Sequence, residues 1–255
     1  MNIENTKASG ATDHYLGSGD LSGTVGVTSA LIKADKQLLE QEHILAPGAS
    51  GSMGNPYKML RTQVLIKLGQ LGTNTLAVLS SHAGAGKTMT AINLAIAIAA
   101  EKGRTALLVD LDLQNPSVSK RFGFEPKIGV EDCIKSGRPV HEALVKISGY
   151  ERLTILPAKN RVENSSELLT DEVAGNIVQE LRTRYSNRII IIDLPPVLEA
   201  DDALAFSKHI GAGLFVVREA KTIKPDIVRS MEIMHDLKIV GTVLNGTREK
   251  IKTYY

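Results

Sequence analysis

Residues 80–88 read Ser-Ser-His-Ala-Gly-Ala-Gly-Lys-Thr and stand between an apolar run, residues 75–80, and a helical pattern that begins at Lys87. A glycine-rich segment that follows a strand and opens a helix is the usual context of a phosphate loop. Gly84 and Gly86 permit backbone angles that turn amide N–H groups inward, and the helix presents its positive end to an anion. Ser81 stands where a first glycine is usual, but the rest of the pattern predicts a phosphate loop.

The side chains of this loop have distinct expected roles. The ammonium group of Lys87 can reach the β- and γ-phosphates of a nucleotide, and the Thr88 hydroxyl can bind Mg²⁺. The alternative is an ordinary glycine-rich turn between a strand and a helix. We expect the nucleotide to be bound by Gly84, Ala85, Gly86, Lys87, Thr88 and Met89.

Outside the loop, short apolar runs alternate with helical patterns. This alternation predicts a doubly wound α/β fold with a mostly parallel sheet that is buried on both faces. Ligands of such sheets bind beyond the carboxyl ends of the strands. The expected strands are residues 75–80, 105–109, 153–156, 189–192, 214–217 and 239–244, and the expected helices are residues 57–71, 87–101, 171–185 and 225–237.

Composition suggests three segments. Residues 1–55 are rich in Gly, Ser, Thr and Asn and predict a flexible arm, with a short helix over residues 30–41. Residues 56–247 form the predicted nucleotide-binding domain, and residues 248–255 form a tail that ends in two tyrosines. We expect the first helix of the domain to end just before Gly72.

Composition also limits the function classes. The net charge of +2 argues against a dedicated nucleic-acid binder, and the basic residues from Arg248 to Lys252 are expected to be a solvated tail. The single cysteine, Cys133, forms no internal disulfide and fits a buried packing role. No signal peptide or membrane-spanning run is visible, so we expect a cytoplasmic protein that reaches a membrane only through a partner.

Three aspartates follow predicted strands. Asp110 and Asp112 follow the strand of residues 105–109, and Asp193 ends the run of four isoleucines at residues 189–192. The carboxyl ends of these strands meet at the edge that carries the phosphate loop. Carboxylates there can hold Mg²⁺ or accept a proton from an attacking hydroxyl. The alternative is that they cap the following helices.

From Tyr57 to the C-terminus, the chain resembles the bacterial tyrosine autokinases of capsule and exopolysaccharide synthesis, which have a P-loop NTPase fold like that of MinD and ParA. The motifs that carry the resemblance are Leu107-Leu108-Val109-Asp110-Leu111-Asp112 (Walker A′) and Ile190-Ile191-Ile192-Asp193-Leu194-Pro195-Pro196-Val197 (Walker B). Further similar stretches are residues 164–169, Val216-Val217-Arg218 with Thr222, and Gly241-Thr242-Val243-Leu244-Asn245.

The resemblance implies a protein-tyrosine kinase that uses ATP and Mg²⁺. It implies that Asp110 activates a tyrosine hydroxyl, that Thr88 and Asp112 ligate Mg²⁺, and that Asp193 supports the metal through water. Lys87 and the loop amides would hold the phosphates. It also implies that Asn245 contacts the adenine and that Tyr254 and Tyr255 are the phosphoacceptors, in a tail that a neighbouring subunit of a ring can phosphorylate.

The chain departs from the family pattern at several positions. Gln114 stands where the family often has Arg, and the assembly motif Glu-x-x-Arg-x-x-Arg reads Asn55, Lys58, Arg61. A homo-oligomeric ring is therefore an open expectation. The family further implies a separate membrane-spanning polysaccharide co-polymerase as activator, which would hold this chain at the inner face of the plasma membrane.

Two other functions stay open. One is a spatial-organiser ATPase related to MinD and ParA. That class carries a signature lysine where this chain has His82, and it lacks a tyrosine-bearing end. The other is a regulator that binds ATP and docks on the export machinery but transfers little phosphate, which the changes at Gln114, Asn55 and Lys58 favour. The spacing of His82, His141, His209 and His235 matches no metal-ligand pattern.

Overall fold

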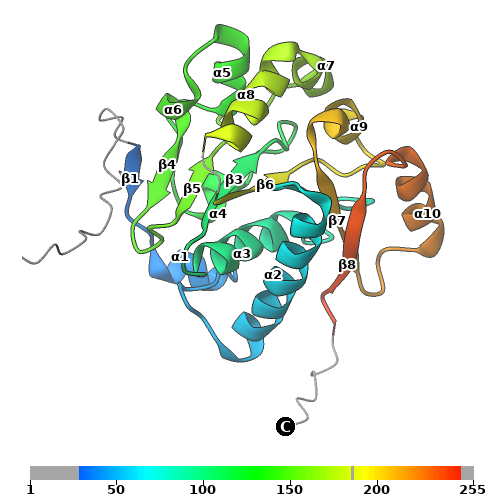
Figure 1. Ribbon diagram of the computed structural model, residues 1–255, viewed down its shortest axis with the longest axis horizontal. Coiled ribbons are helices and arrows are strands. Elements are labelled where there is room, and N and C mark those ends of the chain that lie inside the picture. Colours follow the sequence, from blue (N-terminus) through cyan, green and yellow to red (C-terminus); the bar gives the residue numbers. More distant parts are fainter. Residues whose placement is uncertain (1–28, 185–186, 248–255) are drawn as a thin grey trace, which may run out of the picture.

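In the computed structural model, which describes residues 29–184 and 187–247, eight strands form one sheet between two layers of helices (Figure 1). The strand order is β1-β4-β5-β3-β6-β2-β7-β8, and every neighbouring pair is parallel except β4 and β5. The predicted mostly parallel, doubly wound sheet is confirmed. The strands are β1 (Ala30–Ile32), β2 (Thr75–Leu79), β3 (Thr105–Asp110), β4 (Val145–Ile147), β5 (Leu153–Leu156), β6 (Arg188–Asp193), β7 (Ala212–Arg218) and β8 (Ile239–Asn245).

The helices cover both faces of the sheet. In Figure 1, α2 and α3 lie on one side, and α5 and α8 lie on the other. The helices are α1 (Lys36–Gln41), α2 (Gly51–Leu71), α3 (Lys87–Ala99), α4 (Val118–Arg121), α5 (Val130–Ser136), α6 (Val140–Ala143), α7 (Ser165–Thr170), α8 (Glu172–Thr183), α9 (Asp202–Phe206) and α10 (Lys224–Ile233), with a 3₁₀ turn η1 (Ser207–His209).

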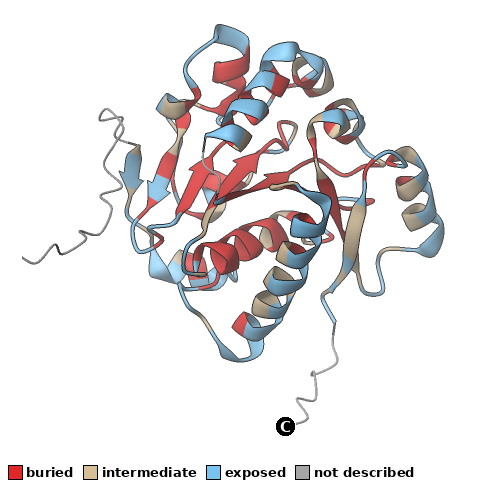
Figure 2. Cartoon of the chain, viewed as in Figure 1, coloured by how far each residue is buried: buried red, intermediate tan, exposed pale blue. Residues whose placement is uncertain are grey.

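The central strands send alternate side chains into two hydrophobic cores. In β2, Leu76 and Val78 pack toward α2 and α3, whereas Ala77 and Leu79 pack toward the other helix layer. All of these side chains are fully buried, and Figure 2 shows the same for the middle of the sheet. Burial on both faces explains why these strands read as continuous apolar runs rather than as alternating ones.

The N-terminal segment differs from the flexible arm expected for residues 1–55. Strand β1 pairs with β4, and Leu39, Ile44 and Leu45 are buried in the core that α2 and α3 share. Residues 29–55 therefore belong to the folded domain, and the predicted boundary at residue 56 lies too far along the chain. Residues 1–28 lie outside the described part.

The helix expected over residues 30–41 is present only as α1. Residues 30–32 of that range form β1, and Asp35 starts α1 by accepting the N–H groups of Gln37 and Leu38. Helix α2 begins at Gly51, earlier than the expected Tyr57, and it ends as expected at Gly72, whose φ is 64°. Polar composition hid this folded segment because its apolar anchors, such as Ile44 and Leu45, form only short runs between polar residues.

Candidate nucleotide-binding site

The phosphate loop lies between β2 and α3, as the sequence predicts. Gly84 and Gly86 have φ values of 74° and 94°, in the left-handed region that glycine adopts at little cost. A Cβ atom at Gly86 would overlap the amide nitrogen of Asn245. Both glycines are thus needed for the course of the loop, and the first turn of α3 carries Thr88 and the half-buried Met89.

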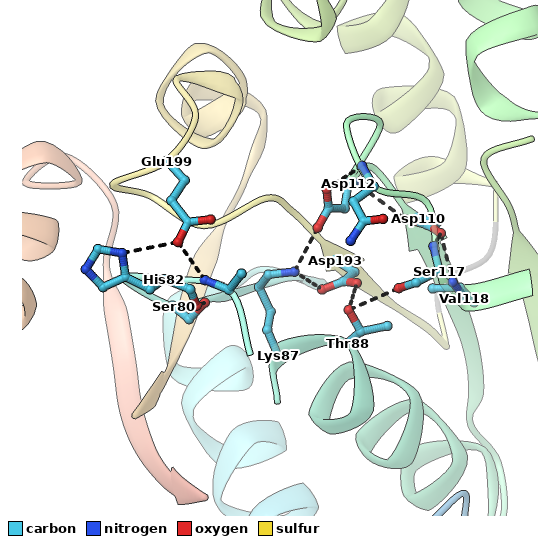
Figure 3. Close-up of polar contacts among 12 residues, drawn as sticks. Ser80, His82, Lys87, Thr88, Asp110, Asp112, Ser117, Val118, Asp193 and Glu199 are labelled. Carbon is cyan, nitrogen blue, oxygen red and sulfur yellow. Dashed lines mark hydrogen bonds and ion pairs between the residues drawn. The ribbon is translucent and has the colours of Figure 1, made fainter. Parts of the chain in front are cut away.

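Lys87 lies in the middle of the site between two carboxylates (Figure 3). Its Nζ is 2.9 Å from Asp193 Oδ1 and 3.3 Å from Asp112 Oδ2, and the side chain is almost fully buried. Burial alone would lower the pKa of Lys87, but the charges of Asp193 and Asp112 outweigh it and the pKa is raised. The Thr88 hydroxyl donates to Asp193 Oδ2 at 2.6 Å. The site thus brings four side chains together, namely Lys87 and Thr88 from the loop, Asp112 from the segment after β3, and Asp193 from β6.

Asp110 lies beside this group because β3 and β6 are paired so that Asp110 is opposite Asp193. Its Oδ2 accepts the N–H groups of Ser117 and Val118 at 3.1 and 3.0 Å. Burial and then the charge of Asp193 raise the pKa of Asp110 to about 8, against the lowering effect of these two donors. Burial likewise raises the pKa of Asp112, which the charge of Lys87 opposes.

These residues fit a magnesium nucleotide. Within residues 29–184 and 187–247, no three His, Cys, Asp or Glu side chains are arranged to hold a metal ion by themselves. Mg²⁺ does not require such a cage, because it usually keeps waters and takes phosphate oxygens beside one or two carboxylates. The Lys87 ammonium lies between Asp112 and Asp193, so this position already holds a positive charge.

The loop also makes contacts with two other segments that were not predicted from the sequence. The carboxylate of Glu199, on the segment after β6, accepts the N–H of Ala83 at 2.9 Å and is 3.2 Å from His82 Nδ1. The other ring nitrogen of His82 is 3.0 Å from Asp226 on α10. His82 therefore joins the loop to two neighbouring segments. No motif in the sequence singles out Glu199, because an isolated exposed glutamate carries no local signal.

The loop is also bound from β7 and β8. Arg218 donates to the carbonyl of Gly84, and Asn245 Nδ2 donates to the carbonyl of Ala85, each at 2.8 Å. The structure thus places Asn245 against the loop, and its expected contact with adenine stays a prediction. Tyr254 and Tyr255 lie outside the described residues.

The positions that depart from the family pattern have structural partners. Gln114 Nε2 donates to Asp202 Oδ2 at 3.0 Å, so it ties the Walker A′ segment to α9. On α2, Arg61 forms an ion pair with Glu101 at 3.2 Å, Asn55 is exposed and Lys58 is half-buried. Arg61 is therefore engaged within its own chain.

Cys133 is buried, and burial, followed by nearby acidic residues, raises the pKa of its thiol to about 11. This fits the expected packing role, because a thiolate is disfavoured there. Among the described residues, no helix combines the length and apolar character that a bilayer crossing requires.

Comparisons with known proteins agree with the motifs. The AAA domain family model matches residues 73–210. The tyrosine-protein kinase YwqD of Bacillus subtilis (strain 168) is 26% identical over 211 residues, which cover 82% of this chain and 87% of YwqD. The succinoglycan biosynthesis transport protein ExoP of Rhizobium meliloti (strain 1021) is 27% identical over 181 residues, which cover 69% of this chain but only 22% of ExoP.

A solved structure, that of the chimerical protein CapA2B2, superposes with a TM-score of 0.73 at 25% identity and covers 86% of this chain and 94% of that one. The fold of this chain is thus found in a solved protein over most of its length. The expected resemblance to bacterial tyrosine kinases is confirmed by the relatives that carry that name.

Proposed function

This chain belongs to the AAA domain family, and from that premise we propose that it is an ATP-dependent protein-tyrosine autokinase that regulates exopolysaccharide or capsule polymerisation and export. One observation carries the proposal. Lys87 and Thr88 of the phosphate loop meet Asp110, Asp112 and Asp193 at a single edge of the sheet. Phosphoryl transfer needs mainly positioning and charge neutralisation, and these groups supply both.

ATP is the proposed phosphate donor. The amides of residues 84–89 surround its phosphates. Lys87 leaves the carboxylates of Asp112 and Asp193 and pairs with the β- and γ-phosphates instead. Thr88 and Asp112 would hold Mg²⁺, and Asp193 would support it through water. When bound, Mg²⁺ neutralises the charge of the phosphate oxygens. Asn245 is proposed to face the base.

Asp110 is the proposed base for the transfer step. One carboxylate oxygen takes the proton from a tyrosine hydroxyl while the tyrosine oxygen bonds to the γ-phosphorus and the bond to the leaving ADP oxygen breaks. A base works best when its pKa is near the working pH. Burial and Asp193 raise the pKa of Asp110 to about 8, which meets this condition.

The tail of residues 248–255 is the proposed acceptor segment, with Tyr254 and Tyr255 as the phosphoacceptors. Each phosphate adds about −1.5 to −2 charge, which would repel a neighbouring subunit and loosen a homo-oligomeric ring. The partner is proposed to be a separate membrane-spanning polysaccharide co-polymerase, which activates the kinase at the inner face of the plasma membrane. Support comes from the relatives, since ExoP is named as a succinoglycan transport protein.

A labelling experiment tests the proposal. The chain is incubated with γ-labelled ATP, Mg²⁺ and the cytoplasmic segment of a candidate co-polymerase, and phosphotyrosine is measured. We expect label on the wild type and none on Lys87→Met or on the Tyr254→Phe/Tyr255→Phe double variant. Lys102→Met is the control, because that lysine is exposed. ATP hydrolysis without protein label would favour an organiser ATPase and contradict the proposal.

A non-catalytic regulator is the second candidate. The observation in its favour is that Asp110 is fully buried and each of its two oxygens accepts a backbone N–H group. Such a carboxylate is held in place and shielded from an incoming hydroxyl. Magnesium-dependent ATP binding without label or hydrolysis would identify the regulator.

A further inference from the structure

A cavity of about 330 Å³ lies between α8 and η1, outside the nucleotide site. Gly175, Asn176, Gln179, Arg182, Lys208 and His209 line it. A second cavity of about 350 Å³ shares Gln179 and Arg182 and extends to Asn74, which precedes β2. The phosphate loop follows the carboxyl end of β2, so the second cavity opens at the opposite edge of the sheet. Each volume is within the range of small-molecule sites.

Two cations line the first cavity without a counter-ion. Within the described part of the chain, neither the Arg182 guanidinium nor the Lys208 ammonium forms an ion pair. The next arginine behaves differently, because Arg184, at the C-cap of α8, pairs with Glu180 at 3.2 Å. The wall contains one carboxylate, Glu172, at the N-terminal end of α8. The lining is therefore net positive.

His209 adds a polar atom that needs a partner. Its Nε2 is buried and has no hydrogen bond within residues 29–184 and 187–247. The ring packs on the backbone of Gly175, where a Cβ atom would clash with it, and lies 5.2 Å from the ring of Phe206. Burial, and then the charge of Lys208, lowers the pKa of His209. A buried ring nitrogen without a partner is destabilising, and it makes the His209 ring sensitive to a change in charge at Lys208 beside it.

We propose that this cavity is a second ligand site and that it binds a small phosphorylated sugar. Arg182 and Lys208 bind the phosphate, because charge-assisted hydrogen bonds to phosphate are the strongest that these cations form. The amides of Asn176 and Gln179 bind hydroxyl groups. Apart from the imidazole of His209, the lining has no aromatic ring on which a nucleobase would stack, so a sugar fits better than a nucleotide.

Isothermal titration calorimetry of the full chain with glucose 1-phosphate tests this site. We expect the Arg182→Ala/Lys208→Ala double variant to bind at least roughly tenfold more weakly than wild type, since two charge-assisted contacts are lost. Arg184→Ala is the matched control and should bind like wild type. Inorganic phosphate should bind more weakly than the sugar phosphate, and glucose should not bind measurably.

The phosphate loop is the competing place for the same probe. Binding that is lost in Lys87→Met but kept in the double variant would assign the probe to that loop and overturn the proposal. Absence of binding to the wild type at millimolar probe would overturn it as well. A second readout is the NMR titration of His209, identified by its loss in His209→Gln. Bound phosphate should raise the pKa of His209 and, at constant pH, leave the ring chemical shifts of the exposed His235 unchanged.

Discussion

At the scale of single residues, the site depends on one ammonium group among three buried carboxylates. Lys87 shares its single positive charge between Asp112 and Asp193, and Asp110 lies opposite Asp193. If Lys87 turns to a phosphate, the carboxylates lose their positive partner. Mg²⁺ would then supply the positive charge that Asp112 and Asp193 lose when Lys87 turns to the nucleotide. We therefore expect nucleotide and Mg²⁺ to bind cooperatively rather than independently.

Lys87→Met should destabilise the nucleotide-free protein as well as abolish its activity. Removing one partner of a buried ion pair costs about 3–5 kcal/mol, because the other charge stays buried without compensation. Urea titration in the presence of a chelator measures this loss. Lys102→Met, at an exposed position, should change stability by less than about 0.5 kcal/mol. Equal stability of the two variants would contradict the buried contacts of Lys87.

Gly86→Ala should remove nucleotide binding, whereas Gly103→Ala should not. Both glycines have positive φ, 94° and 81°, so alanine is strained at both positions by about 1 kcal/mol. Only at Gly86 would the new Cβ overlap another residue, Asn245, and Gly103 has open space around it. Calorimetry with ATP and Mg²⁺ separates the two effects. Wild-type affinity in Gly86→Ala would show that the loop geometry does not matter.

The site residues that belong to a recognisable motif were predicted from the sequence, whereas the other residues that contact the phosphate loop were not. Lys87, Thr88 and the three aspartates are recognisable because strand ends and a glycine-rich loop surround them. Glu199 reaches the loop from a distant segment, and its role depends on a turn after β6 that no local pattern specifies. Contacts between segments far apart in the chain are visible only in the fold.

At the scale of elements, strand pairing explains the site. The register of β3 against β6 puts Asp110 opposite Asp193, and the segment after β3 then brings Asp112 to Lys87. The same segment is joined to α9 through Gln114 and Asp202. Asp202 is fully buried, and the Ser165 hydroxyl lies close to its carboxylate. The hydrogen bond between Gln114 and Asp202 therefore holds the Walker A′ segment against the helix layer that contains α5 and α8.

Asp202→Asn should stabilise the protein at neutral pH. Burial, the largest influence, raises the pKa of Asp202 above that of the unfolded chain, which is about 3.9. The folded state therefore keeps a proton that the unfolded state has lost, so the wild type loses stability as pH rises from about 4 through the raised pKa. Asparagine does not titrate and can still accept from Gln114. We therefore expect Asp202→Asn to have the higher free energy of unfolding at pH 7.

Thermal unfolding between pH 4 and pH 8 measures this effect. The advantage of Asp202→Asn should shrink toward pH 4 and grow with increasing pH. Glu151→Gln, at an exposed position before β5, is the control. A stability difference that does not depend on pH would contradict the raised pKa of Asp202.

Long, regular elements were predictable from the sequence, and most short ones were not. The strands β2, β3, β5, β6, β7 and β8 and the helices α3, α8 and α10 lie at or close to their expected positions. The elements α4, α5, α6, α7, α9 and β4 were not predicted. They span three to seven residues, too few for a periodic pattern to stand out, and their positions depend on packing against the sheet.

At the scale of the whole molecule, the residues before α2 complete the domain. Strand β1 extends the sheet beside β4, and Ile44 and Leu45 fill the core under α3. The backbone of Leu45 is held at both polar groups, because its N–H donates to Asn93 and its carbonyl accepts from Tyr150. The nucleotide-binding domain is therefore not the segment from residue 56 that composition suggests.

Truncation tests this boundary. A chain that begins at residue 51 should be less stable than one that begins at residue 29 by about 5 kcal/mol or more, because Leu39, Ile44 and Leu45 each contribute about 1.5–3 kcal/mol of burial. A loss of that size approaches the whole stability of a typical domain, so the shorter chain should be largely unfolded at room temperature. Circular dichroism with urea titration measures the difference.

If the shorter chain cannot be isolated, point substitutions in the full chain test the same boundary. Leu45→Ala should cost about 2–5 kcal/mol, as expected for a buried leucine. Leu31→Ala is the control from the same segment, since its side chain is 70% exposed, and it should be nearly neutral. If both substitutions are neutral, and if chains beginning at residues 29 and 51 unfold at the same urea concentration, residues 29–50 are dispensable and the domain begins where its composition changes.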